Sequence, residues 1–285
     1  MSGKDNMKLS IITINYNNAA GLKKTLESVA TQTCTDFEHI IVDGASTDGS
    51  VEVIREYENT LVSCLSPLAS HLTWLSEPDT GIYNAMNKGI RMASGEYLLF
   101  LNSGDFLISE DVFERVFANE WTADILCAGC HVSDNGKVIW TSNPPDKVTF
   151  GTLYMVGLAH QSTFIRKSLF EQYGCYDESF RYNADIEFWY RAIVDNGAST
   201  QKIDVITTDY NLDGISSREK LSTNYLEEKR RILRRYKAFI DDYEFLIRKV
   251  HETQLLDWIK QHSYLHKCLI FHNKVERKLK KIFCK

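Results

Sequence analysis

The sequence predicts an α/β protein: a mainly parallel sheet flanked by helices, with a helical extension at the C-terminal end. Short apolar runs alternate with amphipathic stretches along the first hundred residues, which gives the order β-α-β-α. Polar loops follow these runs, as at the carboxyl ends of parallel strands. Beyond about residue 218 strand signals vanish, and apolar residues at helical spacing lie among Lys and Arg. We therefore expect one domain over 1–217 and a basic helical extension over 218–285.

The first elements follow from β-branched runs and polar loops. Residues 9–14 (LSIITI) predict a buried strand, and the apolar positions between 22 and 29 recur at spacings of four and three, as in a helix. A second apolar run over 39–42 ends at the Asp-, Gly- and Ser-rich stretch 43–50, which predicts a loop before a helix over 51–57.

The later elements are less regular. An apolar patch at 72–75 precedes a loop and helix over 77–95, and residues 97–101 (YLLFL) predict a buried strand that ends in Asn-Ser-Gly-Asp. Two strands over 125–132 and 137–141 are joined by an Asp-Asn-Gly turn, which indicates a hairpin. Helices are predicted over 169–173 and 186–195.

Charge and cysteine content narrow the class of protein. Residues 218–285 carry 18 Lys and Arg against 9 Asp and Glu, whereas residues 1–217 carry 15 against 29. An acidic main domain is unsuited to general nucleic-acid binding, but a basic extension suits phosphate or an anionic membrane surface. Seven scattered cysteines, no apolar signal segment and no apolar stretch of spanning length predict a cytoplasmic protein.

Three acidic residues are expected at one edge of the sheet. Asp43 and Asp105 each follow a buried strand, and Asp79 closes a loop. Carboxylates gathered without matching cations repel one another, so this edge is suited to a hard cation with oxygen ligands that holds a diphosphate. The alternative is that such residues cap the helices that follow, and for Asp48 we favour that role.

Four blocks of sequence resemble one enzyme family. They are SIITINYNN at 10–18, IIVDGASTDGS at 40–50, EPDTGIYNAMNKG at 77–89 and ASGEYLLFLNSGD at 93–105. In this order they resemble the inverting glycosyltransferases of family 2, which have the GT-A fold of nucleotide-diphospho-sugar transferases. The similarity covers roughly residues 8 to 215. The second and third blocks are most similar to the bacterial branch that builds capsule, exopolysaccharide and lipopolysaccharide chains.

The resemblance implies a nucleotide-sugar donor. Asp43 matches the base-binding aspartate, and a carboxylate can accept the N3–H hydrogen bond of uracil, which favours a UDP-sugar. Asp79 matches the acidic residue that approaches the nucleoside and the metal. The remaining expected nucleotide-binding residues lie in the first-strand loop and along the donor pocket: Thr13, Asn15, Tyr16, Asn84 and Asn87.

The resemblance also implies a metal. Asp105 matches the aspartate of the DxD-type motif that binds Mg²⁺ or Mn²⁺ on the diphosphate, where the metal acts as a Lewis acid. Many relatives have Asp-x-Asp-Asp here, whereas this chain has Asn102-Ser-Gly-Asp105 and keeps only the last acid. One carboxylate completed by phosphate and water oxygens is an ordinary Mg²⁺ shell, but the strength of binding and the need for metal stay open.

An inverting transfer needs a base for the acceptor hydroxyl, and Asp185 matches that position, with Ala184 in place of a first acid. The alternative is that Asp185 only caps a helix. Glu187, two residues on, faces away and is the less favoured base. His160 and Gln161 belong to a further block of the same branch and are expected either to touch the acceptor or the diphosphate or to be structural.

The predicted activity is therefore a hexosyl- or N-acetylhexosaminyltransferase acting on a saccharide or lipid-linked saccharide in surface polysaccharide biosynthesis. The alternative is a binding module of the same fold with a decayed site, favoured by Gly104 and Ala184, each in place of an acid. No GxGxxG follows the first strand and no GxxxxGK[ST] is present, which argues against dinucleotide-binding and P-loop enzymes.

The basic extension predicts a peripheral location on the inner face of the membrane. An amphipathic helix is expected near the C-terminus, with Lys residues off an apolar stripe. The alternative is that the stripe packs on the chain itself or on a second copy. The stripe consists of Trp258, His262, Leu265, Leu269, His272, Val275, Leu279 and Phe283.

Overall fold

The structure is a computed structural model of the 285-residue chain. It describes residues 7–134, 136–212, 222–252, 270, 272, 274 and 275. The chain divides into two compact units, Met1–Arg218 and Glu219–Lys285.

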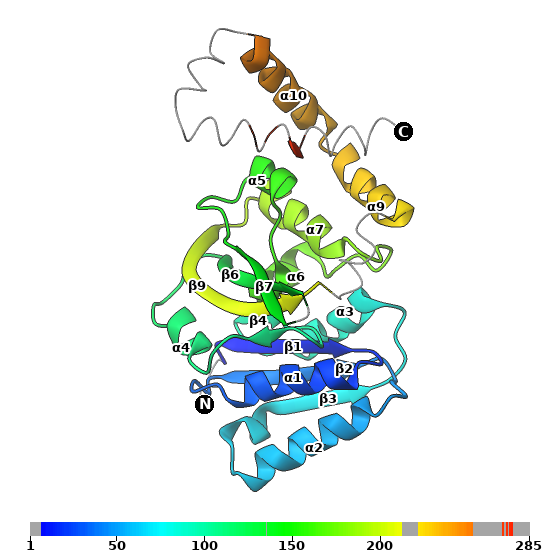
Figure 1. Cartoon of the computed structure of the whole chain (residues 1–285), viewed down its shortest axis with the longest axis vertical. Helices are drawn as coiled ribbons and strands as arrows, with labels where there is room; N and C mark the ends of the chain where they lie inside the picture. Colours follow the sequence, from blue (N-terminus) through cyan, green and yellow to red (C-terminus); the bar gives the residue numbers. More distant parts are fainter. Residues whose placement is uncertain are drawn as a thin grey trace. The chain divides into compact units, whose positions relative to one another are not determined.

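The first half of the larger unit alternates strands and helices as the sequence predicts (Figure 1). Strand ends and helix starts fall where the polar loops were expected, within a residue or two. The elements are β1 (Leu9–Asn15), α1 (Ala19–Ala30), β2 (Phe37–Asp43), α2 (Ser50–Ser63), the 3₁₀ turn η1 (Pro67–His71), β3 (Leu72–Ser76), α3 (Ile82–Met92) and β4 (Tyr97–Phe100).

The second half contains shorter helices and longer strands. The predicted hairpin is present as β6 and β7, and the helix predicted over 186–195 is α7 continued by the π-helix η3. Strands β8 and β9 were not predicted from the sequence. The elements are β5 (Phe106–Leu107), α4 (Val112–Val116), β6 (Ile125–Asp134), β7 (Lys137–Ser142), α5 (Phe150–Met155), η2 (His160–Ser162), β8 (Thr163–Arg166), α6 (Lys167–Tyr173), α7 (Ala184–Trp189), η3 (Tyr190–Asp195) and β9 (Thr200–Asn211).

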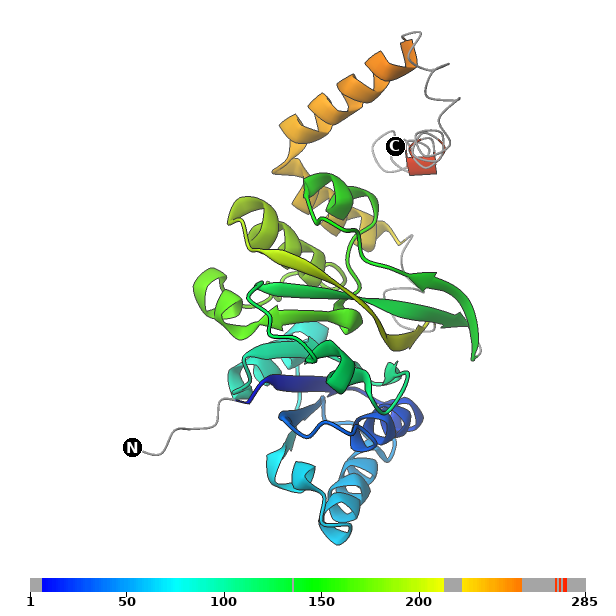
Figure 2. The ribbon, with the colours of Figure 1, turned by 90° about the vertical axis from the view of Figure 1, so that its left-hand side faces the viewer.

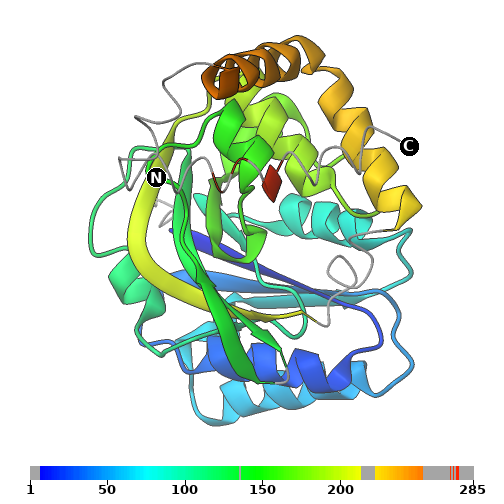
Figure 3. The same ribbon diagram turned by 45° about the horizontal axis from the view of Figure 1, so that its top comes forward.

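All described strands of this unit belong to one sheet. Its order is β3-β2-β1-β4-β8-β6-β9-β5, with β7 paired to β6. The four strands from β3 to β4 are parallel, as is the long β6–β9 pair, whereas β8, β7 and β5 pair antiparallel. Strand β9 curves along β6 over most of its length, as two further views show (Figure 2; Figure 3).

Helices cover both faces of the parallel strands. Leu9 and Ile11 of β1 belong to a buried cluster that includes the apolar sides of α1 and α2. Ile12 faces the other way, against Gly89 of α3, where a Cβ would lie only 2.4 Å from Ile12 Cγ2. The alternation of side chains along β1 thus divides the core into two layers, and Gly89 lets α3 approach the sheet closely.

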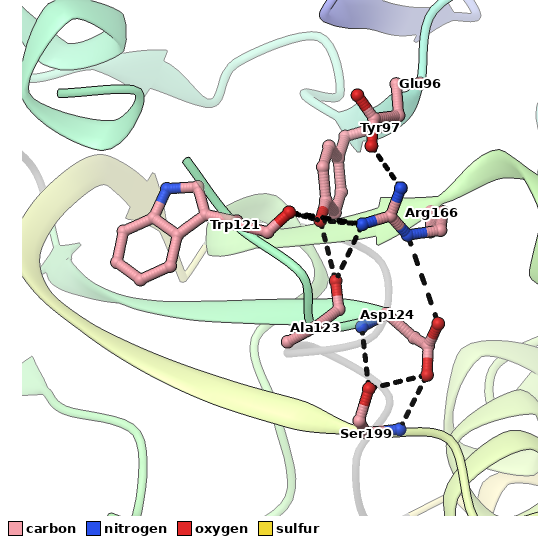
Figure 4. A network of polar contacts seen from close by, with 7 residues as sticks. All are labelled: Glu96, Tyr97, Trp121, Ala123, Asp124, Arg166 and Ser199. Atoms are coloured by element: carbon pink, nitrogen blue, oxygen red, sulfur yellow. Dashed lines mark hydrogen bonds and ion pairs between the residues drawn. The ribbon is translucent and has the colours of Figure 1, made fainter. Parts of the chain in front are cut away.

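Arg166 ties the amino end of β4 to neighbouring strands (Figure 4). Its guanidinium donates to the carboxylate of Glu96 and, at 2.7 Å, to the hydroxyl of Tyr97, and it lies 3.9 Å from Asp124. Asp124 in turn accepts hydrogen bonds from the backbone N–H and the hydroxyl of Ser199, just before β9. This network fixes the strand ends that lie opposite the polar loops.

The smaller unit contains α9 (Thr223–Arg234), capped by Ser222, and α10 (Lys237–Glu252). Of the predicted C-terminal stripe only His272 and Val275 lie within the described residues, so the membrane-binding helix stays a prediction. None of the described helices is long and apolar enough to cross a membrane.

A buried histidine predicts how stability depends on pH. His39 is fully buried between the hydroxyls of Thr13 (3.0 Å) and Tyr57 (3.1 Å), and burial lowers its pKa to about 3. Between that pKa and the unfolded value of about 6.5, only the unfolded chain binds the proton, so stability is lost as the pH falls. From about pH 6.5 to 5 this amounts to roughly 2 kcal/mol.

Chemical unfolding at both pH values should therefore show a smaller acid-induced loss for His39→Gln than for the parent chain. Tyr57→Phe, which keeps the imidazole, is the control and should retain the parent's pH dependence. Equal acid sensitivity of His39→Gln and parent would contradict the assignment.

Candidate functional site

The polar edge of the sheet is built on Asp43, the last residue of β2. In the parallel register Asp43 stands beside Asn15 of β1 and Ser76 of β3. Its Oδ1 accepts from Asn15 Nδ2 (2.8 Å) and Ser46 Oγ (2.6 Å), and its Oδ2 accepts from Ser46 N (2.9 Å) and Ser76 Oγ (2.6 Å). Burial alone would raise the pKa of Asp43, but these hydrogen bonds outweigh it and hold the pKa below its usual value.

These four bonds bear on the role expected for Asp43. Its side chain is fully buried, and each carboxylate oxygen already accepts two hydrogen bonds. A uracil N3–H would therefore have to displace one of the present donors, such as Ser46 or Ser76. In this structure Asp43 organises the loops around it.

The two loops after β1 and β2 are tied together. Asn17 and Ala45 have positive φ values of 48° and 61°, a conformation that non-glycine residues adopt only where surrounding contacts hold it. Asn17 N donates to Ser46 Oγ (2.8 Å), and Asp48 accepts from Ala19 N at the start of α1 (2.8 Å). Asp48 also accepts from the backbone and hydroxyl of Ser50, which agrees with the capping role favoured from the sequence.

Tyr16, Gly44 and Asp79 meet at the surface of this edge. Tyr16 is 67% exposed, so its ring is open to solvent. A Cβ on Gly44 would lie 2.5 Å from Asp79 Oδ2 and 3.1 Å from Tyr16 Cδ2. Glycine at position 44 therefore lets the carboxylate and the ring approach the chain, and together they form an aromatic face beside an acid, which suits a nucleoside.

Three residues expected to contact the nucleotide have hydrogen-bond partners within the protein. Thr13 is fully buried and bonded to His39, so it supports the strand beneath the site. Asn84 and Asn87 both donate to Glu178 (2.8 Å each). The side-chain amide of Asn87 also donates to the backbone carbonyl of Tyr176 and accepts from its backbone N–H. In this structure the two asparagines hold the loop of Glu178 on α3, and their contact with the nucleotide stays a prediction. The sequence places them correctly on α3 but does not show their partner.

Asp105 follows β4 at the same edge. Burial raises its pKa to about 7 against the opposing charge of His160, and the carboxylate of Asp209 adds to the rise. A carboxylate whose charge is poorly compensated suits a cation, and Asn102 Oδ1, three residues earlier, is buried without a hydrogen-bond partner. Among the residues that the structure describes, no three His, Cys, Asp or Glu side chains are grouped to hold a metal by themselves.

Gly104 has a φ of +105°, a conformation that an acid at this position would adopt only with strain. Glycine in place of the usual acid at position 104 is therefore explained by the backbone conformation of this loop.

Asp185 lies at the start of α7 and is held by two side chains. Its Oδ1 accepts from the Tyr83 hydroxyl of α3 (2.9 Å), and its Oδ2 lies 3.5 Å from His160 Nδ1. His160 Nε2 is 3.1 Å from Asn102 Nδ2. Burial would lower the pKa of His160, but Asp185 and Asp105 outweigh it and raise the pKa above its ordinary value. The structure thus joins Asp185, His160 and the loop of Asp105, which the sequence separates by up to 83 residues.

Glu187, the other acidic residue of α7, is paired with a cationic side chain. Glu187 forms a bidentate ion pair with Arg191 (2.9 and 3.1 Å), whose guanidinium also donates to the carbonyls of Gly174 and Cys175 (2.9 Å each). Arg191 lies in the π-helix that continues α7, a form that often accompanies functional sites. Ala184 is fully buried, so an acid there would not face the open site. Gln161 is also buried, at 5% exposure, and its contact with the acceptor or the diphosphate stays a prediction.

Comparison with known sequences decides the family. The model of glycosyl transferase family 2 matches residues 10–176, more than half of the chain. The chain belongs to glycosyltransferase family 2. A relative from Mycobacterium bovis (strain BCG / Pasteur 1173P2), named PGL/p-HBAD biosynthesis glycosyltransferase, is 31% identical over 221 residues, which cover 76% of this chain and 82% of the relative. The bacterial capsule and lipopolysaccharide branch is not confirmed by these relatives.

Solved structures confirm the predicted GT-A fold. S. aureus TarS 1-349 in complex with UDP-GlcNAc has a TM-score of 0.63 at 20% identity, over 79% of this chain and 65% of the TarS 1-349 chain. The mannosyltransferase PcManGT from Pyrobaculum calidifontis, in complex with GDP-Man and Mn²⁺, has a TM-score of 0.59 at 14% identity, over 98% of this chain and 88% of PcManGT. Position 185 lies beyond the family match, so its role depends on the geometry above.

Several residues of the site were missed by the sequence analysis. Ser46 and Ser76 complete the shell of Asp43, Tyr83 holds Asp185, and Glu178 anchors the asparagines of α3. Tyr83 and Ser46 lie within the blocks that resemble the family. Their position could therefore have marked them as site residues, but it could not show which side chains they contact. Glu178 has no signal in the sequence because its partners are about 90 residues away.

Gly44→Ala should weaken nucleotide binding without unfolding the chain. The added methyl would clash with Asp79 and Tyr16, and displacing either by overpacking costs on the order of 1 to 3 kcal/mol, or about 5- to 150-fold in affinity for UDP. Calorimetric titration with UDP measures the effect. Gly151→Ala is a matched control, because its Cβ would meet nothing closer than 3.7 Å. Unchanged UDP affinity in Gly44→Ala would remove this surface from the nucleotide site.

Proposed function

We propose that the chain is an inverting glycosyltransferase that transfers a sugar from a nucleotide-diphosphate sugar to a saccharide or lipid-linked saccharide. The observation that carries the proposal is the chain of contacts from Asp185 through His160 to Asn102. It brings a carboxylate suited to general-base work to the loop that ends in Asp105. Family membership supports the transferase class.

The donor proposed is UDP-linked, with a hexosyl or N-acetylhexosaminyl group. Tyr16 and Asp79 offer a ring and an acid to the nucleoside, and a carboxylate at Asp43 suits the N3–H of uracil once a serine hydroxyl gives way. TarS, which shares the fold, was solved with UDP-GlcNAc, whereas PcManGT was solved with GDP-Man. The nucleobase of the donor is therefore tested directly below.

Asp105 is the residue proposed to hold Mg²⁺ or Mn²⁺, in company with donor phosphate and water oxygens. Its raised pKa and the unpaired oxygen of Asn102 fit a cation at this edge. When bound there, a divalent cation would offset the negative charge that develops on the leaving nucleoside diphosphate. PcManGT was solved with Mn²⁺.

Asp185 is proposed to accept the proton of the acceptor hydroxyl. As the hydroxyl oxygen forms a bond to the anomeric carbon, the bond from that carbon to the diphosphate oxygen breaks, and the proton passes to Asp185. Attack from the face opposite the leaving group inverts the configuration. Tyr83 and His160 hold the carboxylate during this step.

The acceptor proposed is a growing surface saccharide. The relative from Mycobacterium bovis is named PGL/p-HBAD biosynthesis glycosyltransferase, so an acceptor of that biosynthesis competes with a polysaccharide. A decayed binding module remains the alternative function, but Gly104 is explained by its loop conformation and Ala184 by burial. Retention of Asp43, Asp79, Asp105 and Asp185 supports an active enzyme.

Nucleotide preference and metal dependence are tested together by thermal unfolding. UDP with Mn²⁺ should stabilise the parent by roughly 2 to 3 kcal/mol at about 100 times its dissociation constant, and GDP should do less. Asp105→Asn should keep the fold but lose the difference between Mn²⁺ and EDTA. A shift with GDP alone would contradict the donor, and UDP binding insensitive to EDTA in both proteins would contradict the metal.

Asp185→Asn tests the base. The amide can still accept from Tyr83 but cannot take a proton, so UDP affinity should stay near the parental value while the transfer rate falls by roughly 10² to 10⁴. Glu187→Gln is the matched control, since that acid is paired with Arg191. Transfer at the parental rate by Asp185→Asn would leave Asp185 as a helix cap.

A further inference from the structure

We propose that Tyr83 and His160 are positioning residues that orient the Asp185 carboxylate, and that His160 couples it to the loop bearing Asp105. This inference rests on the proposed function, in which Asp185 is the base. The two residues come from different elements, α3 and η2, and meet only in the folded chain.

Each oxygen of the Asp185 carboxylate contacts a different side chain. Tyr83 donates its hydroxyl to Oδ1 at 2.9 Å, and His160 Nδ1 lies 3.5 Å from Oδ2. Two contacts on two oxygens fix both the direction and the plane of the carboxylate. Because a carboxylate oxygen accepts more than one hydrogen bond, either oxygen keeps capacity for an acceptor hydroxyl.

Tyr83 is itself held rigidly. Its ring is 6% exposed and packs on Tyr176 at 5.5 Å between centroids. Tyr176 is held on α3 because its backbone carbonyl and N–H are hydrogen-bonded to the side chain of Asn87. Burial and the charge of Asp185 raise the pKa of Tyr83 well above its usual value, so the hydroxyl remains a proton donor at neutral pH.

The two ring nitrogens of His160 face different partners. Nδ1 faces Asp185, and Nε2 lies 3.1 Å from the side-chain amide of Asn102. Asn102 also closes the turn that positions Asp105, because its carbonyl accepts from Asp105 N at 2.9 Å. One imidazole therefore links the proposed base to the proposed diphosphate loop.

Two substitutions separate the contacts of His160. An Asn amide extends about as far as Nδ1 and can donate to Asp185, whereas a Gln amide extends about as far as Nε2 and can only replace the contact to Asn102. His160→Asn should therefore retain most of kcat, and His160→Gln should lose about 10- to 100-fold. Dissociation constants for UDP with Mn²⁺ should be parental in both.

Tyr83→Phe provides a second, independent variant. It removes only the hydroxyl and keeps the ring on Tyr176, so kcat should fall by about tenfold at unchanged KM for the donor. Tyr57→Phe and His131→Gln are matched controls: Tyr57 bonds to His39 and His131 to Thr141, and both variants should keep the parental kcat. Circular dichroism confirms that every variant is folded.

The outcomes distinguish the inference from the function beneath it. Equal kcat in His160→Asn and His160→Gln, or parental kcat in Tyr83→Phe, would overturn the positioning role. Weaker UDP binding in both His160 variants would also overturn it and assign His160 to the diphosphate. Parental turnover by Asp185→Asn in the same assay would instead refute the base, and with it the proposed function.

Discussion

The burial of one charged group organises the edge of the sheet that is proposed to bind the nucleotide. The carboxylate of Asp43 lies at the end of a central strand with no exposed surface, and an ionised carboxylate in such a place is tolerated only when its oxygens are satisfied. Asn15, Ser46 and Ser76 supply the donors. They reach Asp43 because β1, β2 and β3 are parallel and end level with one another. The loops that follow must therefore fold back over Asp43.

The strained backbone of these loops follows from that requirement. Asn17 and Ala45 take positive φ values so that Ser46 can face both Asp43 and the first loop. Gly44, which precedes Ala45, has no side chain, and this leaves room for Tyr16 and Asp79. A buried carboxylate thus determines the shape of the exposed surface proposed for the nucleoside.

The surroundings of Asp185, the proposed base, are assembled by polar contacts between residues far apart in the sequence. Asn87 and Glu178 hold the segment before α7 on α3, and Arg191 fastens the end of α6 to the π-helix. These ties bring Asp185 to Tyr83 and His160. Each of these contacts involves a charged or amide group whose burial without a partner would cost free energy. The loss of one partner would therefore weaken the others.

The sequence alone was sufficient for the first half of the fold and for the positions of the acids. Apolar runs of β1, β2 and β4 are buried on both faces, so they are read directly from composition, and the loops after them contain the residues that a family resemblance identifies. Strands β8 and β9 were not predicted from the sequence: β8 has only four residues, polar residues interrupt β9, and both strands are defined by their pairing with β6.

Only the tertiary structure decided what the polar side chains do. The sequence determined that Asp43, Asp105 and Asp185 follow strands or begin a helix, since those positions depend on local patterns. It did not determine that Asn84 and Asn87 face Glu178, that Thr13 is buried against His39, or that His160 joins Asp185 to Asn102. Those partners are tens of residues apart, and a hydrogen bond needs directions and distances that only the packed sheet and helices fix.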